Sequence, residues 1–149
     1  MEISYFEMSP GDIPAVAAME AKYFGIPWKE ESIAHYMEAG NTIFLTARRA
    51  KKIVGYMALM CVADESDLVS ICVHEDYRNL GIARELLDIS YEMASKRGVR
   101  TVNLEVRESN AAAISLYESE NFTRVGKRPG FYKKPEEDAL LYRKELEDA

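Results

Sequence analysis

Residues 68–98 read LVSICVHEDYRNLGIARELLDISYEMASKRG and decide the fold, because an apolar strand runs here into an amphipathic helix. The strand, Asp67–Val73, has the small and β-branched residues that are typical of a buried strand. Apolar and small residues then recur at helical spacing, at Ala83, Leu86, Leu87, Ser90, Tyr91 and Ala94. Gly98 follows the basic last turn as a helix-terminating residue. The stretch therefore predicts a strand, a turn at His74–Ala83 and a long helix.

The turn contains the pattern Arg78-x-x-Gly81-x-Ala83 directly before the helix. The start of a helix exposes unpaired amide groups and the positive end of the helix dipole, which together favour an anion such as a pyrophosphate. Gly81 and Ala83 lack bulk, so an anion can approach the backbone closely. The pattern is neither a Walker A motif nor a dinucleotide fingerprint. A plain strand-to-helix turn is the alternative interpretation.

A second strand–helix unit follows, with a strand at Thr101–Arg107 and Asn110 as the N-cap of a short helix. Alternation puts Glu105 on the polar face of this strand, where a solvated carboxylate paired with Arg107 is the simplest interpretation. Tyr117 lies on the helix at a spacing that is also typical of a core tyrosine. We expect the helix to end near Asn121, a residue that tolerates left-handed geometry.

The flanking sequence completes a mixed α/β or α+β pattern in one domain, residues 1–149. We expect a strand at Ile3–Glu7, a helix from Ile13 to about Phe24 and a helix from Lys29 to about Ala39. A hairpin of Thr42–Arg48 and Ile53–Val62 follows. The final strands are predicted at Thr123–Arg128 and Ala139–Glu145, joined by a loop at Pro129–Asp138 whose charged run Lys133–Asp138 is expected to be solvated.

Composition narrows the classes of function. The 149 residues carry 19 Lys and Arg against 25 Asp and Glu, a net charge of −6. This balance disfavours a binder of nucleic-acid phosphates and suits a basic partner such as a cationic peptide, although acidity can also serve solubility alone. Cys61 and Cys72 lie in apolar runs and are predicted to be buried thiols. We expect no metal site, membrane segment or signal peptide, and a cytoplasmic protein.

Taken together, the anion turn, long helix, strand and Asn-capped helix with Leu116-Tyr117 resemble the GNAT superfamily of acetyl-CoA-dependent N-acetyltransferases. Residues 104–118, LEVRESNAAAISLYE, are similar to its RimI-like branch, the ribosomal-protein-alanine acetyltransferases. Pro27-Trp28 and residues 137–140, EDAL, match the same branch, so the resemblance covers nearly the whole chain. It implies a mixed, mostly antiparallel sheet of about seven strands, splayed at a coenzyme cleft, with about four helices.

The resemblance also implies roles for individual residues around acetyl-CoA as co-substrate. Glu105 would be the general base and Tyr117 the general acid. Trp28 and Tyr132 would flank the acceptor. The acetyl and pantetheine groups would lie along the backbone of Ile71, Cys72 and Val73, with Asn110 at the pantetheine arm. The pyrophosphate would meet the turn, formed by Arg78, Asn79, Leu80, Gly81, Ile82, Ala83 and Arg84.

Three positions depart from the family pattern. Ala83 stands at the last glycine of the turn, which is an accepted variant. Asn121 replaces the glycine of the Leu-Gly-Phe that usually follows the catalytic helix, and we expect it to adopt positive φ. Gly130-Phe131-Tyr132 replaces the Asn-Tyr-Tyr of the RimI-like branch and so lacks one phenol.

Amine chemistry favours an N-terminal acceptor. With a pKa of about 7.7–8.0 an α-amine is roughly 10–20% neutral at neutral pH, whereas a lysine is only about 0.04% neutral. The leading hypothesis is therefore direct transfer, in a ternary complex, to the N-terminal alanine of a basic small-subunit ribosomal protein by a monomer or weak dimer. A broader N-terminal, lysine or small-amine acetyltransferase is the alternative, followed by a non-catalytic acyl-CoA-binding module. Neither nucleic acid nor a membrane is expected as a partner.

Overall fold

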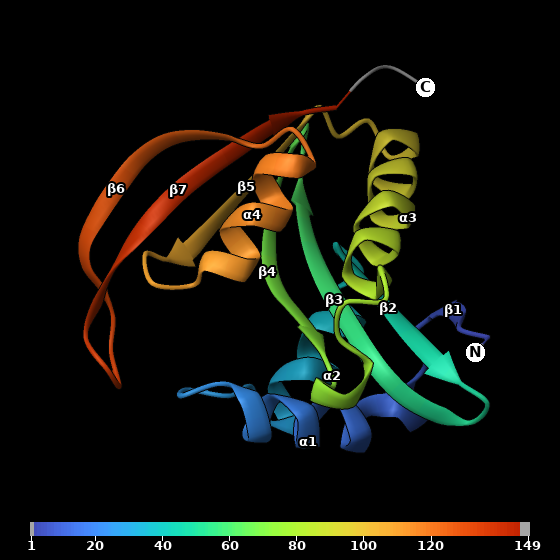
Figure 1. The fold of residues 1–149 in the computed structure, drawn as a ribbon. Coiled ribbons are helices and arrows are strands. Elements are labelled where there is room, and N and C mark those ends of the chain that lie inside the picture. The colour runs from blue at the N-terminus through green and yellow to red at the C-terminus, as the bar shows by residue number, and fades with distance from the viewer. Residues whose placement is uncertain (1, 147–149) are drawn as a thin grey trace.

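The computed structural model describes residues 2–146, which form a seven-stranded sheet with helices on both faces (Figure 1). The strand order is β1-β2-β3-β4-β5-β7-β6, and every neighbouring pair is antiparallel except β4 and β5. The mixed, mostly antiparallel sheet is therefore confirmed. In chain order the elements are β1 (Ser4–Glu7), η1 (Pro10–Asp12), α1 (Ile13–Tyr23), α2 (Glu30–Ala39), β2 (Thr42–Arg49), β3 (Lys52–Val62), β4 (Glu65–Val73), η2 (Glu75–Tyr77), α3 (Ile82–Lys96), β5 (Thr101–Arg107), α4 (Ala111–Ser119), β6 (Thr123–Tyr132) and β7 (Glu137–Glu145).

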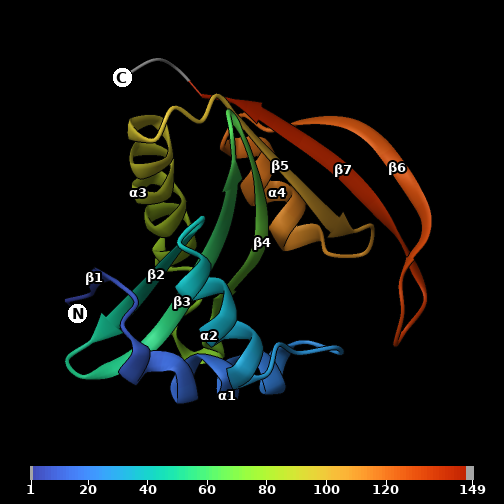
Figure 2. The same cartoon turned by 180° about the vertical axis from the view of Figure 1, so that it is seen from behind.

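Two apolar cores lie on the two faces of the sheet. Figures 1 and 2 show the helices that cover these faces. Leu86 and Leu87 of α3 and Tyr117 of α4 belong to the larger core, with strand residues of β2, β3, β4, β5 and β7. On the other face Val16 of α1 and Ile33 of α2 pack against β2, β3 and the end of β4. The helices α3 and α4 thus share one face, and α1 and α2 cover the opposite face at one end only.

The sheet opens between β4 and β5. The parallel pairing of β4 with β5 covers only Glu65–Asp67 of β4, and the last pair joins Asp67 to Asn103 of β5. The register of β4 with β3 then steps from Leu68 to Ser70, so Val69 forms a β-bulge two residues after the last pair of β4 with β5. A bulge bends the strand that contains it and ends regular pairing. Beyond Val69, β4 therefore leaves β5, as the expected splay requires.

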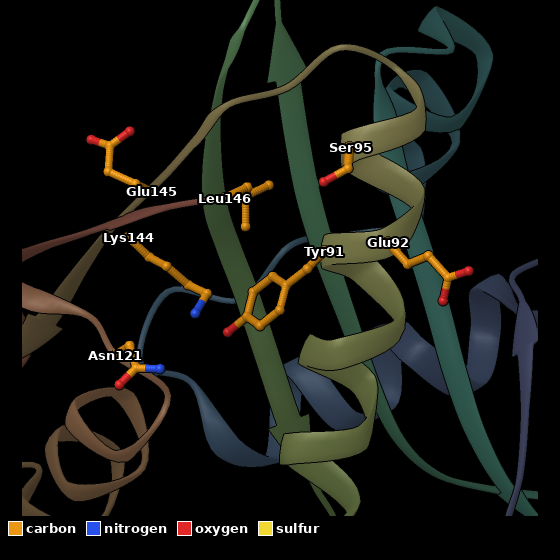
Figure 3. A pocket seen from close by; sticks show the side chains of 7 residues that line it. All are labelled: Tyr91, Glu92, Ser95, Asn121, Lys144, Glu145 and Leu146. Carbon is orange, nitrogen blue, oxygen red and sulfur yellow. The ribbon is translucent and has the colours of Figure 1, made fainter. Parts of the chain in front are cut away.

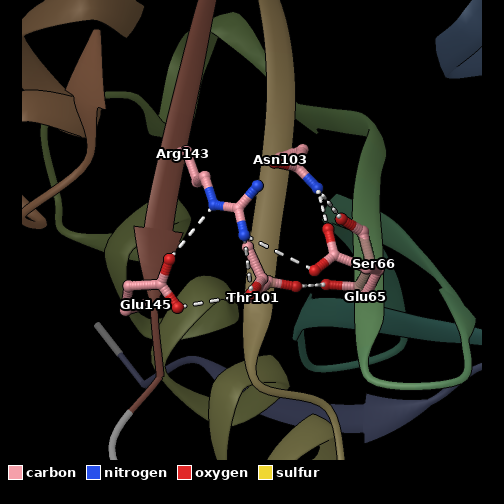
Figure 4. Close-up of polar contacts among 6 residues, drawn as sticks. All are labelled: Glu65, Ser66, Thr101, Asn103, Arg143 and Glu145. Carbon is pink, nitrogen blue, oxygen red and sulfur yellow. Dashed lines mark hydrogen bonds and ion pairs between the residues drawn. The ribbon is translucent and has the colours of Figure 1, made fainter. Parts of the chain in front are cut away.

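Polar side chains hold the closed end of this opening together (Figure 4). The Ser66 hydroxyl donates to the Thr101 carbonyl across β4 and β5 at 2.8 Å. The Asn103 amide donates to Glu65 Oε1 at 3.0 Å, and Arg143 of β7 lies 3.6 Å from Glu65 Oε2. These contacts join β4, β5 and β7 at the point from which the first two diverge.

The helix ends follow the sequence closely. Gly81 precedes α3 at φ 79°, and Gly98 follows it at φ 87°. The Asn110 side chain accepts a hydrogen bond from the Ala113 amide at 3.2 Å and caps α4 as predicted. Asn121, in the place of the family's glycine, adopts φ 68° and confirms the expected left-handed turn.

The prediction of a loop over Pro129–Asp138 was wrong. β6 continues to Tyr132 and β7 begins at Glu137, which leaves a turn of residues 133–136. Pro129 is accommodated because β6 is an edge strand, where a missing amide donor costs no ladder hydrogen bond. The register also shifts between Arg128 and Tyr132, where Gly130 adopts φ 63°.

The structure also shows the surroundings of the two cysteines and the character of the helices. Cys72 is buried as predicted, whereas Cys61 is only partly buried, and both thiols are free. Within residues 2–146, none of the helices combines the length and the apolar character needed to cross a membrane.

Candidate active site

A cavity of about 660 Å³ lies where the end of β4, the start of α3 and one side of α4 meet. It is lined by every residue that the resemblance implies for the coenzyme except Leu80, which is 54% exposed. Residues far apart in the chain thus form one wall. These are Ile71, Cys72, Val73, Arg78, Asn79, Gly81, Ile82, Ala83, Arg84 and Asn110.

The start of α3 supplies the polar end of the cavity. The first helical hydrogen bond runs from the Glu85 amide to the Gly81 carbonyl, at 3.0 Å, so the amides before Glu85 precede the helical ladder. The Arg78 guanidinium donates to the Val73 carbonyl at 3.0 Å and lies 5.0 Å from the Tyr23 ring centroid. Arg78 and the residues that carry the first amides of α3 line the same cavity, and amides at a helix start suit a pyrophosphate.

Arg84 contributes its backbone rather than its guanidinium to this wall. Its side chain spans to the end of α4, where it binds Glu120 at 2.7 Å and the Ser119 hydroxyl at 2.9 Å. Tyr23 and Phe24, from the end of α1, also line the cavity. Sequence reasoning missed both, because Phe24 fits the helical spacing of a core residue and no pattern singles out Tyr23.

Tyr117 faces the cavity from α4 and is only 6% exposed. Its ring packs edge-on against Phe122, with 5.5 Å between centroids. Burial, and then the neighbouring Tyr132, raise the pKa of the Tyr117 phenol well above its ordinary value. The phenol is therefore protonated at neutral pH and can donate a hydrogen bond or a proton into the cavity.

Glu105 does not line the cavity. It lies two residues beyond the last pair of β5 with β4, with its side chain exposed, while Leu104 and Val106 on either side are buried in the core. The carboxylate therefore stands on the face of β5 opposite α3 and α4, beside the opening. The expected partnership with Arg107 is absent among the described residues, because Arg107 pairs with Glu137 at 3.3 Å.

Tyr132 of β6 links the two candidate catalytic groups electrostatically. Burial and the Glu105 carboxylate, in that order, raise the pKa of Tyr132 to about 12. Tyr132 in turn contributes to the raised pKa of Tyr117. Side chains from β5, β6 and α4 are therefore close enough to influence one another, although no sequence spacing connects them.

Trp28 packs into the connection between α1 and α2, and its place beside the acceptor stays a prediction. Its ring packs on Tyr36, with 5.3 Å between centroids, and on Phe44 at 6.4 Å. Its amide donates to the buried carboxylate of Glu20 at 2.9 Å, and this contact holds the connection between α1 and α2. Trp28 does not line the cavity.

A second hollow, of about 430 Å³, lies between the C-terminal half of α3 and the end of β7 (Figure 3). Lys144 lies there 4.9 Å from the Tyr91 ring centroid and donates to the Glu120 carbonyl at 2.7 Å. None of the predicted site residues takes part in it. Its lining consists of Tyr91, Glu92, Ser95, Asn121, Lys144, Glu145 and Leu146.

The chain matches a known family of proteins. The profile of the acetyltransferase (GNAT) domain matches residues 14–133, which is most of the chain. The chain belongs to the GNAT acetyltransferase family. Membership accounts for the splayed sheet and for the cavity at the start of α3, both of which the resemblance in sequence implied.

Within the GNAT family, the chain is similar to ribosomal-protein-alanine acetyltransferases. The chain is 36% identical over 132 residues to the [ribosomal protein bS18]-alanine N-acetyltransferase of Escherichia coli K12, covering 87% of this chain and 88% of the relative. The crystal structure of the Escherichia coli ribosomal-protein-S18-alanine N-acetyltransferase superposes with a TM-score of 0.89 at 31% identity, covering 99% and 96% of the two chains. Arabidopsis thaliana NAA60 in complex with acetyl-CoA has the same fold, with a TM-score of 0.89 at 21% identity and coverage of 97% and 99%.

Proposed function

We propose that this GNAT protein transfers the acetyl group of acetyl-CoA to a protein α-amine, the N-terminal alanine of ribosomal protein bS18, by direct transfer in a ternary complex. The observation that carries the proposal is the opening between β4 and β5. The start of α3 and one side of α4 line the cavity together with the ends of β4 and α1, whereas Glu105 does not line it and stands on the face of β5 opposite α3 and α4. Two substrates can thus approach from opposite faces and meet between the strands.

The cavity suits the coenzyme in both shape and chemistry. The amides at the start of α3 and the Arg78 guanidinium would hold the pyrophosphate. The backbone of Ile71, Cys72 and Val73, which β4 leaves unpaired on the β5 side, would hold the pantetheine arm. Apolar side chains of α4 close the opposite wall, and Asn110 stands at its end. The bound coenzyme would supply an activated thioester.

Glu105 and Tyr117 would then handle the two protons of the reaction. Glu105 accepts the proton that the amine loses as its nitrogen bonds to the acetyl carbon, directly or through one water molecule. The Tyr117 phenol donates toward the sulfur as the carbon–sulfur bond breaks, which suits a group that burial keeps protonated. The Cys72 or Val73 amide would polarise the acetyl carbonyl.

Two observations support the acceptor. Relatives that are 36% and 34% identical carry the name of bS18-alanine N-acetyltransferases. The net charge of −6 favours a basic client over an acidic one. With a ribosomal client, we expect the enzyme to work in the cytoplasm as a monomer or weak dimer.

An acceptor screen tests the proposal. Thiol release from acetyl-CoA is followed with short basic peptides that differ only in their first residue, with an N-terminally blocked lysine peptide and with a free polyamine. We expect the alanine-started peptide that begins bS18 to be acetylated at its α-amine, as located by mass spectrometry. Equal or faster turnover of the blocked lysine peptide or the polyamine would contradict the proposal.

A further inference from the structure

Arg107 makes more contacts than its place on an exposed strand face requires. Its side chain is 27% exposed, and its guanidinium carbon lies 4.5 Å from the centroid of the Tyr132 ring. Both terminal nitrogens donate hydrogen bonds into the hairpin of β6 and β7. The acceptors are the Pro135 carbonyl at 2.9 Å, the Lys133 carbonyl at 3.1 Å and Glu137 Oε1 at 3.3 Å.

The hairpin needs this support because its own ladder is weak at this end. The register breaks between Arg128 and Tyr132, and only Tyr132 with Glu137 is paired beyond the break. The turn of residues 133–136 therefore depends on contacts from outside the hairpin. A guanidinium suits this role because its planar fork donates in several fixed directions while its face covers a ring, and an ammonium cannot do both.

The same turn reaches the other segments around the candidate site. A Cβ atom on Gly25, between α1 and α2, would lie 2.9 Å from the Lys134 carbonyl oxygen, so the two connections are in direct contact. The second oxygen of Glu137 accepts from the Ser109 amide at 2.6 Å, just before α4. The turn therefore contacts the connection between α1 and α2, and Glu137, which follows the turn, contacts the segment before α4.

We propose that Arg107 is a positioning residue that holds the turn of residues 133–136, and with it the Tyr132 ring, beside Glu105 on the acceptor side of the opening. This inference rests on the proposed function. Arg107 touches neither substrate in this account. It acts through Tyr132 and the turn, so its loss affects the acceptor and leaves coenzyme binding intact.

The test compares Arg107→Met and Arg107→Lys with a matched control, Arg128→Met. Arg128 lies on the same hairpin, 5.3 Å from the Phe131 ring centroid, and is exposed. For each variant we would measure hydrogen–deuterium exchange of residues 132–137, the KM for the alanine-started peptide, and the dissociation constant of acetyl-CoA by calorimetry.

We expect Arg107→Met to speed exchange in the turn and to raise the peptide KM about tenfold or more, with coenzyme affinity changed less than about twofold. Arg107→Lys keeps the charge, but its exchange in the turn and its peptide KM should stay close to those of Arg107→Met. Arg128→Met should have the exchange and the peptide KM of the wild type. In a further variant, Arg107→Ala, which leaves space for the ion, free guanidinium should lower the peptide KM.

Unchanged exchange in the turn of both Arg107 variants would overturn the inference. An equal loss of coenzyme affinity would overturn it too, since that would indicate a general structural role. Because exchange is measured without turnover, it still decides the role of Arg107 if the wild type proves inactive on peptides. Inactivity of the wild type would contradict the proposed function instead.

Discussion

At the scale of single residues, Glu105 and Tyr117 carry the proposed proton transfers. We predict that Glu105→Gln and Tyr117→Phe each lower kcat by roughly 10²–10⁴-fold with coenzyme binding retained. Steady-state thiol release and calorimetry with acetyl-CoA would measure the two effects separately. Glu108→Gln is the matched control, because Glu108 is an exposed carboxylate on the same segment that pairs only with Lys127 among the described residues. Wild-type rates in both catalytic variants would remove the assigned roles.

Asp12 gives a prediction about pH. Its carboxylate accepts from the Ser9 amide at 2.8 Å and from Arg48 at 2.6 Å. Burial alone would raise the pKa of Asp12, but the Ser9 amide and the Arg48 charge outweigh burial and hold this pKa below 3.8. Since the folded pKa lies below the unfolded one, the stabilisation is complete above the ordinary value and is lost as the pH falls through the folded value.

We therefore expect Asp12→Asn to lower the free energy of unfolding by about 1–3 kcal/mol at neutral pH. The difference from the wild type should shrink below about pH 4, as wild-type Asp12 becomes protonated. Urea unfolding across this pH range measures both, with Glu38→Gln, an exposed carboxylate of α2, as the control. A difference that stays constant with pH would contradict the ion-pair explanation.

Some residues of the candidate site can be predicted from the sequence, and others cannot. Arg78, Gly81 and Asn110 are predictable because each acts within its own turn or helix cap. The proximity of Glu105 to Tyr132 is not predictable in the same way, since it depends on how a hairpin about 27 residues later in the chain curls back over β5. Neither local propensity nor spacing contains that information.

At the scale of elements, the junction of β4 and α3 depends on one backbone conformation. Gly81 adopts φ 79° with no atom within 4 Å of where a Cβ would lie. Gly81→Ala should therefore cost about 1–2 kcal/mol from backbone strain alone. Because the strain tilts the first amides of α3, we expect weaker acetyl-CoA binding with little change in the peptide KM. Calorimetry would check this, and unaltered coenzyme affinity would contradict the place given to the pyrophosphate.

The connection between α1 and α2 depends on the buried carboxyl group of Glu20, which is 3% exposed. It accepts from the Trp28 amide at 2.9 Å and from the Ser70 hydroxyl at 2.7 Å. Glu20→Ala leaves both donors without their acceptor and should cost about 1–3 kcal/mol in urea unfolding. It should also raise the peptide KM through the loosened connection. Glu20→Gln keeps the shape of the side chain and one acceptor oxygen, so it should lower the free energy of unfolding less than Glu20→Ala does. An equal loss of stability in the two variants would contradict this explanation.

The elements themselves were largely predictable, with one instructive exception. Caps and periodicity locate α2, α3, α4 and β5, because local chemistry defines their ends. The ends of β6 and β7 depend instead on pairing with each other, so the proline and glycine at 129 and 130 indicated a loop where an edge strand continues.

At the scale of the whole molecule, function depends on an opening in an otherwise continuous sheet. The bulge at Val69 is invisible in the sequence, because a β-branched residue in an apolar run is typical of regular strand. Only the resemblance to a family implied the splay. The structure gives its physical cause in the bulge, and the polar contacts of Figure 4 limit how far it extends.

The most direct test is a crystal structure of the chain with coenzyme A joined covalently to the α-amine of an alanine-started peptide. The account predicts the pyrophosphate against the amides of residues 79–84, the former amine beside Glu105, and the peptide leaving on the face opposite α3. A conjugate lodged in the hollow around Tyr91, or a peptide leaving past α4, would contradict it.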